Sequence, residues 1–318
     1  MRAVVVGGGS WGSVFSTLLR DRGHEVTLAC RDPAQATAIG ATGRNPRYLT
    51  DVDLHGVAAA PLAEAPWEGA ELLVLAVPSR EFAEVARALP PGPPVLILTK
   101  GLDPATGGRL SELVRGRGVA VLSGPNHAEE IAQGLPAAAV VASEDEQLAT
   151  DLQHAIISPL YRVYVNTDLV GVELCAAAKN VIALAAGGVD GLELGDNAKA
   201  GLISRGLREM ARLGGACGAR PETFSGLAGM GDLIVTCWSR YSRNRRAGEL
   251  IARGATAAEA RAEIAMAVEG LTTAPVLRDL SRRLGIGLPI TEAVCAVLDG
   301  VGPREAGAAL MGRTPTEE

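Results

Sequence analysis

Short apolar runs recur along the first half of the chain, and glycine or polar residues follow most of them. These runs lie at residues 2–6, 25–30, 72–77, 95–99, 119–123, 137–142 and 161–165. Runs that are continuous rather than alternating are typical of strands covered on both faces. Residues 1–166 are therefore predicted to form an α/β domain, a largely parallel sheet with helices on both faces. Residues 33–71 are harder to interpret; we expect a helix, a loop at 44–53 and a weak strand near Val57.

After Asp168 the strand pattern gives way to helical periodicity. Helices are expected at 169–186, 197–213, 245–253, 256–266, 272–283, 291–298 and 304–311. Gly187-Gly188 is expected to end the first of them. The stretches 225–238, rich in glycine, and 239–246, rich in arginine, are expected to be loops. Residues 167–318 are thus predicted to be a separate all-helical domain.

The first strand leads into Gly7-Gly8-Gly9-Ser10-Trp11-Gly12, and a helix-like segment follows. G-x-G-x-x-G between a strand and a helix is the dinucleotide-binding, or Rossmann, fingerprint. Gly7 permits the tight turn, Gly9 lets the backbone approach a pyrophosphate, and Gly12 allows close helix–strand packing. A glycine-rich turn without a ligand is the simpler alternative.

Arg31 stands where the second strand ends, about twenty residues after the fingerprint, a position that normally reads the adenosine ribose. An arginine there favours a 2′-phosphate, so NADP is predicted to be preferred over NAD. Asp32 could accept from a bare 2′-hydroxyl and leaves NAD as a second cofactor. Arg31 could also be a solvated residue at the strand end.

Ligands of parallel sheets bind beyond the carboxyl ends of the strands. The residues that follow the later strands include Ser79, Lys100, Gly124 and Asn126. They are expected to converge on one cleft.

Lys179 is the single charged residue between Leu174 and Ala186, and the chain contains only three lysines, Lys100, Lys179 and Lys199, among 30 basic residues. Burial disfavours the ammonium form of a lysine, and a lysine can exchange a proton where an arginine cannot. We therefore consider Lys179 a candidate general acid–base. The alternative is a structural lysine paired with an acid. A second candidate site is the arginine-rich turn, which is interpreted as a phosphate site. The alternative is a solvated basic turn or a nucleic-acid patch.

A net charge of −6 argues against nucleic-acid binding. No uncharged apolar segment reaches about 18 residues, so no membrane span is expected. The five scattered cysteines suit reduced thiols in the cytoplasm, and no metal-ligand spacing is present.

The chain resembles the bacterial-type NAD(P)-dependent glycerol-3-phosphate dehydrogenases nearly from end to end. The resemblance rests on GGGSWG (7–12), TKGL (99–102), AAKNVIALAAG (177–187), DNAKAGLISRG (196–206), GMGDLIVTC (229–237), SRNRR (242–246) and LPITEAV (288–294). It implies a Rossmann domain joined to a helical domain, with the active site between them. It also implies a cytoplasmic enzyme that takes a small-molecule substrate, with a homodimer as the candidate assembly.

By this resemblance Lys179 is the catalytic proton donor and acceptor. The implied substrate-binding residues are Lys100, Gly124, Asn126, Lys179, Asp232, Ser242, Arg243 and Asn244. The implied cofactor-binding residues are Gly7, Gly9, Ser10, Trp11, Gly12, Arg31, Lys100, Ala128, Arg243, Ala267 and Glu269. The chain departs from the family at Asn126, where a serine or threonine is usual.

The predicted reaction interconverts dihydroxyacetone phosphate and sn-glycerol 3-phosphate by hydride transfer with NAD(P)H. Its product would supply glycerophospholipid synthesis. One alternative is a related two-domain reductase acting on a small hydroxy acid, which would need a carboxylate site. The other is a nucleotide-binding regulator without turnover, which would give the buried Lys179 no purpose.

Overall fold

A computed structural model describes residues 1–314 of the chain, which divides into two compact units. The first unit comprises Met1–Lys100 and Arg109–Val172, and the second comprises Gly101–Gly108 and the chain from Glu173 onward. The division falls six residues after the position, 166, at which the sequence pattern changes from strands to helices. Residues Gly101–Gly108 belong to the second unit, and the hydrophobic pattern of the sequence did not predict this.

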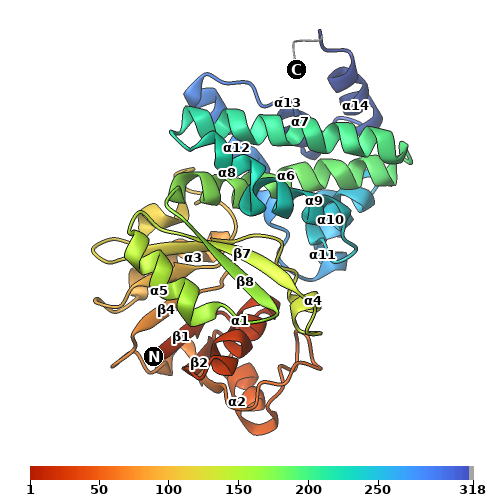
Figure 1. The fold of residues 1–318 in the computed structure, drawn as a ribbon. Helices are drawn as coiled ribbons and strands as arrows, with labels where there is room; N and C mark the ends of the chain where they lie inside the picture. The colour runs from red at the N-terminus through yellow and green to blue at the C-terminus, as the bar shows by residue number, and fades with distance from the viewer. Residues whose placement is uncertain (315–318) are drawn as a thin grey trace. The chain divides into compact units, whose positions relative to one another are not determined.

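The first unit contains an eight-stranded sheet in the order β3-β2-β1-β4-β5-β6-β7-β8 (Figure 1). Its strands are β1 (Arg2–Val6), β2 (Glu25–Cys30), β3 (Ala58–Pro61), β4 (Leu72–Leu75), β5 (Val95–Ile97), β6 (Val119–Ser123), β7 (Ala137–Ala142) and β8 (Tyr161–Asn166). Neighbouring strands are parallel except for β6 and β7, which pair antiparallel. The strand order changes direction between β1 and β4, and such a switch point is where ligands bind in open α/β sheets.

Helices cover both faces of this sheet. They are α1 (Ser10–Asp21), α2 (Pro33–Thr42), α3 (Ser79–Ala88), α4 (Ala128–Ile131) and α5 (Glu146–Ile156), with short 3₁₀ turns η1 (Leu62–Glu64) and η2 (Leu110–Leu113). Phe15 of α1, Ile39 of α2 and Leu152 of α5 share one core cluster with Val5 of the sheet. The chain steps from β1 to β2 in one direction and from β4 to β5 in the other. Right-handed crossovers therefore place α1 and α3 on opposite faces.

Two central strands are shorter than the hydrophobic pattern predicts. The apolar runs continue to 77 and 99, but β4 ends at Leu75 and β5 at Ile97. The residues beyond are buried or half-buried loop, and the Thr99 hydroxyl donates to the Val77 carbonyl at 2.7 Å. This bond ties together two of the loops that follow the carboxyl ends of the strands.

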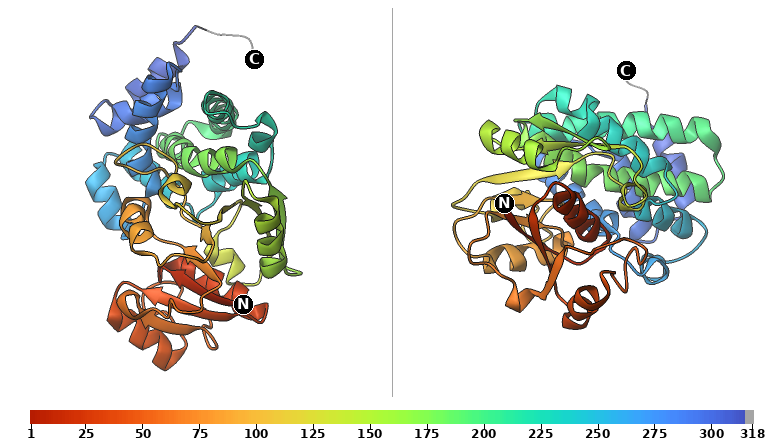
Figure 2. Two further views of the ribbon diagram at one scale, coloured as in Figure 1. Left: turned by 90° about the vertical axis from the view of Figure 1, so that its left-hand side faces the viewer. Right: turned by 60° about the horizontal axis from the view of Figure 1, so that its bottom comes forward.

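The second unit is helical. Its helices are α6 (Leu169–Gly191, beginning in the last residues of the first unit), α7 (Gly195–Ala216), α8 (Pro221–Ser225), α9 (Asp232–Trp238), α10 (Arg243–Ala252), α11 (Ala257–Ile264), α12 (Glu269–Leu284), α13 (Pro289–Leu298) and α14 (Pro303–Met311). The long helices α6 and α7 lie antiparallel, because Ile182 faces Gly206 and Asp190 faces Lys199. Helices α12, α13 and α14 pack in succession and form the blue part of the chain in Figure 2. Helix α13 also contacts α7.

Glu209 of α7 fastens α13 to this bundle. Its carboxylate accepts the backbone N–H groups of Ile290 and Thr291 at 2.7 and 2.9 Å, and the Thr291 hydroxyl at 2.6 Å. Burial raises the pKa of the Glu209 carboxyl, although these three hydrogen bonds oppose the shift. The contact caps the first turn of α13, whose N–H groups have no acceptor within the helix.

The prediction that Gly187-Gly188 ends a helix is wrong, because α6 continues to Gly191. A Cβ atom at Gly187 would overlap the backbone of Arg245, and one at Gly248 would overlap that of Leu184. These glycines therefore let α6 and α10 approach closely. The cost of glycine inside a helix is offset by backbone contact between the two helices.

The predicted loop at 225–238 is also wrong. After α8, residues Leu227–Gly231 form one π-helical turn (η3) that runs into α9. A Cβ atom at Gly229 would overlap the backbone of Phe224. Glycine is thus needed here for packing, whereas the sequence pattern alone suggested a flexible connection.

Helix α6 is long and apolar enough to cross a membrane by length and composition. However, 89% of its most apolar window is buried inside the protein. Such burial is typical of the central helix of a bundle, which is apolar all round.

Candidate active site

The turn between β1 and α1 has the shape that a dinucleotide pyrophosphate requires. Gly7 has a φ of +118°, which favours glycine, and a Cβ atom at Gly12 would overlap the Gly7 carbonyl oxygen. A Cβ atom at Gly9 would meet nothing within 4 Å. Helix α1 starts at the next residue without a side-chain cap. Open space beside uncapped N–H groups fits an anion.

Two buried side chains that the sequence analysis did not single out support this turn. Gln35 and Asn45 both donate to the Gly8 carbonyl, at 2.6 and 2.9 Å. Asn45 also donates to the Ser13 hydroxyl at 2.9 Å. At the start of α1, the Trp11 ring packs edge-on against Phe15, and its buried Nε1 has no hydrogen-bond partner among the residues that the structure describes. Asn45 lies in the stretch expected to be an ordinary loop, and only the tertiary contact reveals its role.

Arg31 is mostly exposed, with its guanidinium 2.8 Å from Glu81 of α3. The Asp32 carboxylate accepts the Ala34 N–H at 3.0 Å and so caps α2. Its other oxygen lies 3.7 Å from Arg47. Two arginines therefore stand at the end of β2, and the neighbouring acid already has a structural role.

Lys100, Gly124 and Asn126 follow neighbouring strands, and the fold brings them together in the first unit. Lys100 donates to the Gly124 carbonyl at 3.0 Å. Gly124 has a φ of +140°, and an added Cβ would crowd the Ala138 carbonyl. The Asn126 side-chain oxygen accepts from the Tyr161 hydroxyl at 3.1 Å, while its buried Nδ2 has no hydrogen-bond partner within residues 1–314. An anchored amide with an unused donor can bind an oxygen-rich ligand.

Lys179 lies on α6 in the second unit, where its ammonium is buried and paired. Its Nζ lies 2.5 Å from the Asp232 carboxylate and 2.8 Å from the Thr236 hydroxyl. Asp232 and Thr236 are four residues apart on α9 and so share one face of that helix. All three side chains are almost completely buried. Thr236 was absent from the predicted set, and its spacing from Asp232 becomes meaningful only once residues 232–238 are known to be helical.

Asn180 and Asn244 form a bridge beside this lysine. Asn244 Nδ2 donates to Asn180 Oδ1 at 2.9 Å, and Asn244 Oδ1 accepts the Gly270 N–H at 2.8 Å. The bridge ties α6, α10 and the start of α12, next to Ala267 and Glu269. This hydrogen bond joins Asn180, which directly follows Lys179, to Asn244, which directly follows Arg243.

Arg243 begins α10 and is exposed. Ser242, the residue before it, caps the helix by accepting the Arg245 N–H at 3.2 Å. The cap leaves the N–H groups of Arg243 and Asn244 at the helix start. A guanidinium next to such N–H groups is suited to a phosphate.

Comparisons with known proteins identify the two halves. Residues 2–149 match the family described as NAD-dependent glycerol-3-phosphate dehydrogenase N-terminus, and residues 168–307 match its C-terminus. The chain belongs to the NAD-dependent glycerol-3-phosphate dehydrogenase family. The predicted family and fold class are confirmed.

Full-length relatives within this family are similar over the whole chain. Glycerol-3-phosphate dehydrogenase [NAD(P)+] of Moorella thermoacetica is 47% identical over 99% of this chain and 96% of its own, and that of Streptomyces coelicolor is 45% identical over 100% and 98%. The crystal structure of glycerol-3-phosphate dehydrogenase from Coxiella burnetii superposes with a TM-score of 0.94 at 36% identity, covering 98% of this chain and 99% of that one. A ketopantoate reductase from Ralstonia eutropha has a TM-score of 0.60 at 18% identity and shares the fold.

Cys237 of this glycerol-3-phosphate dehydrogenase family member lies next to one of the residues that hold Lys179. Cys237 follows Thr236 on α9, but burial raises the pKa of its thiol to about 12. A thiol that stays protonated is a poor nucleophile and a poor metal ligand. Cys237 therefore serves as a small packing residue.

Proposed function

We propose that the protein interconverts dihydroxyacetone phosphate and sn-glycerol 3-phosphate with NAD(P)H, with Lys179 as general acid–base. The observation that carries this proposal is the Asn180–Asn244 hydrogen bond of 2.9 Å. It joins the helix that carries Lys179 to the helix that begins at Arg243, which supports assigning both residues to one site. A three-carbon substrate with a carbonyl and a phosphate needs this pair of functions.

A bound dihydronicotinamide supplies the hydride that reduces the substrate carbonyl. Lys179 donates a proton to the carbonyl oxygen as negative charge develops there, and in the reverse direction it accepts the proton from the hydroxyl. Asp232 and Thr236 hold the lysine Nζ in position. Lys100 is assigned as a second cation for the developing charge. The reduction consumes one proton, which Lys179 recovers from solvent.

The phosphate is assigned to Arg243 and the N–H groups at the start of α10. It lies away from the reacting carbon, so its binding energy positions the carbonyl. Ser242 and Asn244 are assigned to the same phosphate region. In the structure both side chains also have internal roles, as helix cap and as bridge. Asn126, which replaces the serine or threonine usual in the family, is assigned to a substrate oxygen through its unused Nδ2.

The pyrophosphate is assigned to the turn containing Gly7, Gly9 and Gly12, with Ser10 and Trp11 beside it. Ala128, Ala267 and Glu269 are assigned to other parts of the cofactor. The preference for NADP over NAD is proposed from Arg31, with Arg47 as a second cation at the same strand end. Supply of the product to glycerophospholipid synthesis, a cytoplasmic location and a homodimer stay predictions from the family resemblance.

The deciding assay mixes the purified protein with NADPH and follows its oxidation after addition of dihydroxyacetone phosphate. Rapid oxidation is expected, with much slower oxidation when unphosphorylated dihydroxyacetone replaces it. A 2-oxo acid tests the alternative of a hydroxy-acid reductase. Turnover of the 2-oxo acid in preference to dihydroxyacetone phosphate would overturn the assignment of substrate.

A further inference from the structure

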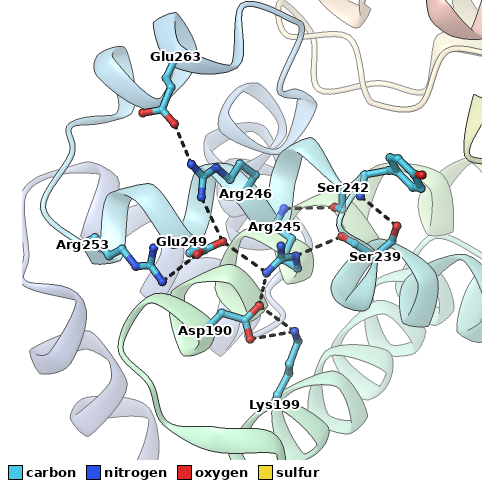
Figure 3. Close-up of polar contacts among 10 residues, drawn as sticks. Asp190, Lys199, Ser239, Ser242, Arg245, Arg246, Glu249, Arg253 and Glu263 are labelled. Atoms are coloured by element: carbon cyan, nitrogen blue, oxygen red, sulfur yellow. Dashed lines mark hydrogen bonds and ion pairs between the residues drawn. The ribbon is translucent and has the colours of Figure 1, made fainter. Parts of the chain in front are cut away.

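A network of charged side chains lies behind the proposed phosphate site and has no part in the chemistry described above (Figure 3). Asp190, near the end of α6, is its centre. Its carboxylate accepts from Lys199 of α7 at 2.9 and 2.8 Å and from Arg245 of α10 at 2.6 Å. Lys199 and Arg245 are both largely shielded from solvent. Their charges are compensated by a shared acid, and the three helices are thereby held together.

Arg245 also holds the turn that precedes the phosphate site. Its Nε donates to the Ser239 carbonyl at 3.2 Å, and the Ser242 N–H donates to that same carbonyl at 3.2 Å. Its own backbone N–H donates to the Ser242 hydroxyl. The guanidinium therefore uses Nη1 on Asp190 and Nε on the turn, a rigid fork of two separate nitrogens that the single nitrogen of a lysine does not reproduce.

Lys199 acts on the other end of the same turn. Its ammonium lies 4.7 Å from the centre of the Trp238 ring, a cation–π contact, and Trp238 is the last residue of α9. Helix α9 also carries Asp232 and Thr236, which hold Lys179. Asp190 is thus linked through Lys199 to the residue before the turn, and through Arg245 to the turn itself.

We propose that Asp190, Lys199 and Arg245 are positioning residues that set the backbone of the Ser239–Ser242 turn, and with it the phosphate-binding start of α10. This inference rests on the proposed function, because it concerns how the phosphate is held. Displacement of a binding group by about 1 Å can cost two orders of magnitude in rate. Loss of the Arg245 contact to the turn should therefore weaken phosphate recognition although Arg245 itself need not touch the substrate.

Arg245→Lys is the first variant, because lysine keeps the charge opposite Asp190 but cannot also reach the Ser239 carbonyl. We expect KM for dihydroxyacetone phosphate to rise about tenfold and kcat to fall. The inhibition constant of inorganic phosphate, competing with this substrate, should rise by a similar factor. Turnover of unphosphorylated dihydroxyacetone should stay within about twofold of wild type.

Arg253→Lys is the matched control. Arg253 directly follows α10 and pairs with Glu249 at 2.9 Å, an acid that also lies 3.5 Å from Arg245. Its side chain is half exposed, and among the described residues its ion pair is with Glu249 and not with the turn. This variant should match wild type in every assay. Thermal unfolding of all variants separates loss of fold from loss of positioning.

Asp190→Asn is the second variant and gives a test if Arg245→Lys does not fold. It should show the same selective loss with the phosphorylated substrate. The double variant should be no worse than the poorer single variant, because both act through one turn. The proposal would be overturned if the losses of the two single variants multiplied in the double variant. Equal losses with dihydroxyacetone phosphate and dihydroxyacetone would also overturn it, as would an unchanged KM for dihydroxyacetone phosphate in Arg245→Lys. Wild type that fails to reduce dihydroxyacetone phosphate would instead overturn the proposed function.

Discussion

The first unit offers a ligand mainly backbone groups at an open turn, whereas the second offers buried side chains that carry charge. At the β1–α1 turn the essential features are the positive φ of Gly7 and the open space at Gly9. In the second unit the essential features are the Lys179–Asp232 pair and the asparagine bridge behind it. The first arrangement is one of backbone shape, and the second is one of buried polar and charged side chains.

Substitutions in the two units should therefore have separable effects. A change of shape in the first unit should alter cofactor affinity. A change of charge in the second should alter the chemical step or recognition of the phosphorylated substrate. The variants below test this separation, beginning with the largest expected effect.

Lys179→Ala should lower kcat by about 10²–10⁴, because the general acid is lost. Cofactor affinity, measured by NADPH fluorescence, should be nearly unchanged. Lys179→Arg should fail as well, since arginine keeps the charge but cannot exchange the proton. Retention of more than a tenth of wild-type activity by a folded alanine variant would refute the catalytic assignment. It would leave Lys179 as the structural partner of Asp232.

Arg243→Ala should raise KM for dihydroxyacetone phosphate and lower kcat, for a loss of roughly a hundredfold in kcat/KM. Dihydroxyacetone, which lacks the phosphate, should be little affected. Steady-state kinetics with both substrates provide the comparison. Equal losses with the two substrates would indicate that Arg243 serves the cofactor or the fold.

Arg31→Ala should reduce kcat/KM with NADPH about tenfold and leave the value with NADH nearly unchanged. Because Arg31 already pairs with Glu81, a 2′-phosphate has to compete with that carboxylate. Glu81→Gln should therefore shift the preference further toward NADPH. The ratio of the two kcat/KM values decides the matter, and an unchanged ratio in both variants would place recognition of the 2′-phosphate elsewhere.

The smallest effects should come from a pair of glycine variants in the fingerprint. Gly9→Ala should change stability by less than about 0.5 kcal/mol, because the added methyl meets nothing and the backbone at Gly9 is extended. It should nevertheless weaken cofactor binding. Gly12→Ala should cost about 1–3 kcal/mol in unfolding free energy through overlap with Gly7. Thermal denaturation with and without NADPH measures the stability and the cofactor binding of each variant. If Gly9→Ala and Gly12→Ala lost equal stability, the proposed difference between an open position and a packed position would be wrong.

The strands of the first unit could be predicted from the sequence because a buried parallel strand leaves a local signal, a continuous apolar run. β1, β2, β6 and β7 have the predicted bounds. The helices of the second unit were located with larger errors, most of all at Gly187-Gly188 and at residues 225–238. Glycine has several uses, and the local sequence does not say whether it supplies a turn or permits two backbones to touch.

The fold class, the fingerprint turn and an apolar helix with one lysine could all be predicted before folding was considered, because each depends on residues near one another in the chain. The partners of that lysine and the support of the two binding turns were decided only by the tertiary structure. Asp232 and Lys179 are 53 residues apart, Asn180 and Asn244 are 64 apart, and Asn45 is 37 residues from Gly8. Contacts between such distant residues form only when helices and loops pack. Which of these contacts form depends on how many side chains fit together in the packed interior. A local sequence pattern does not show that fit.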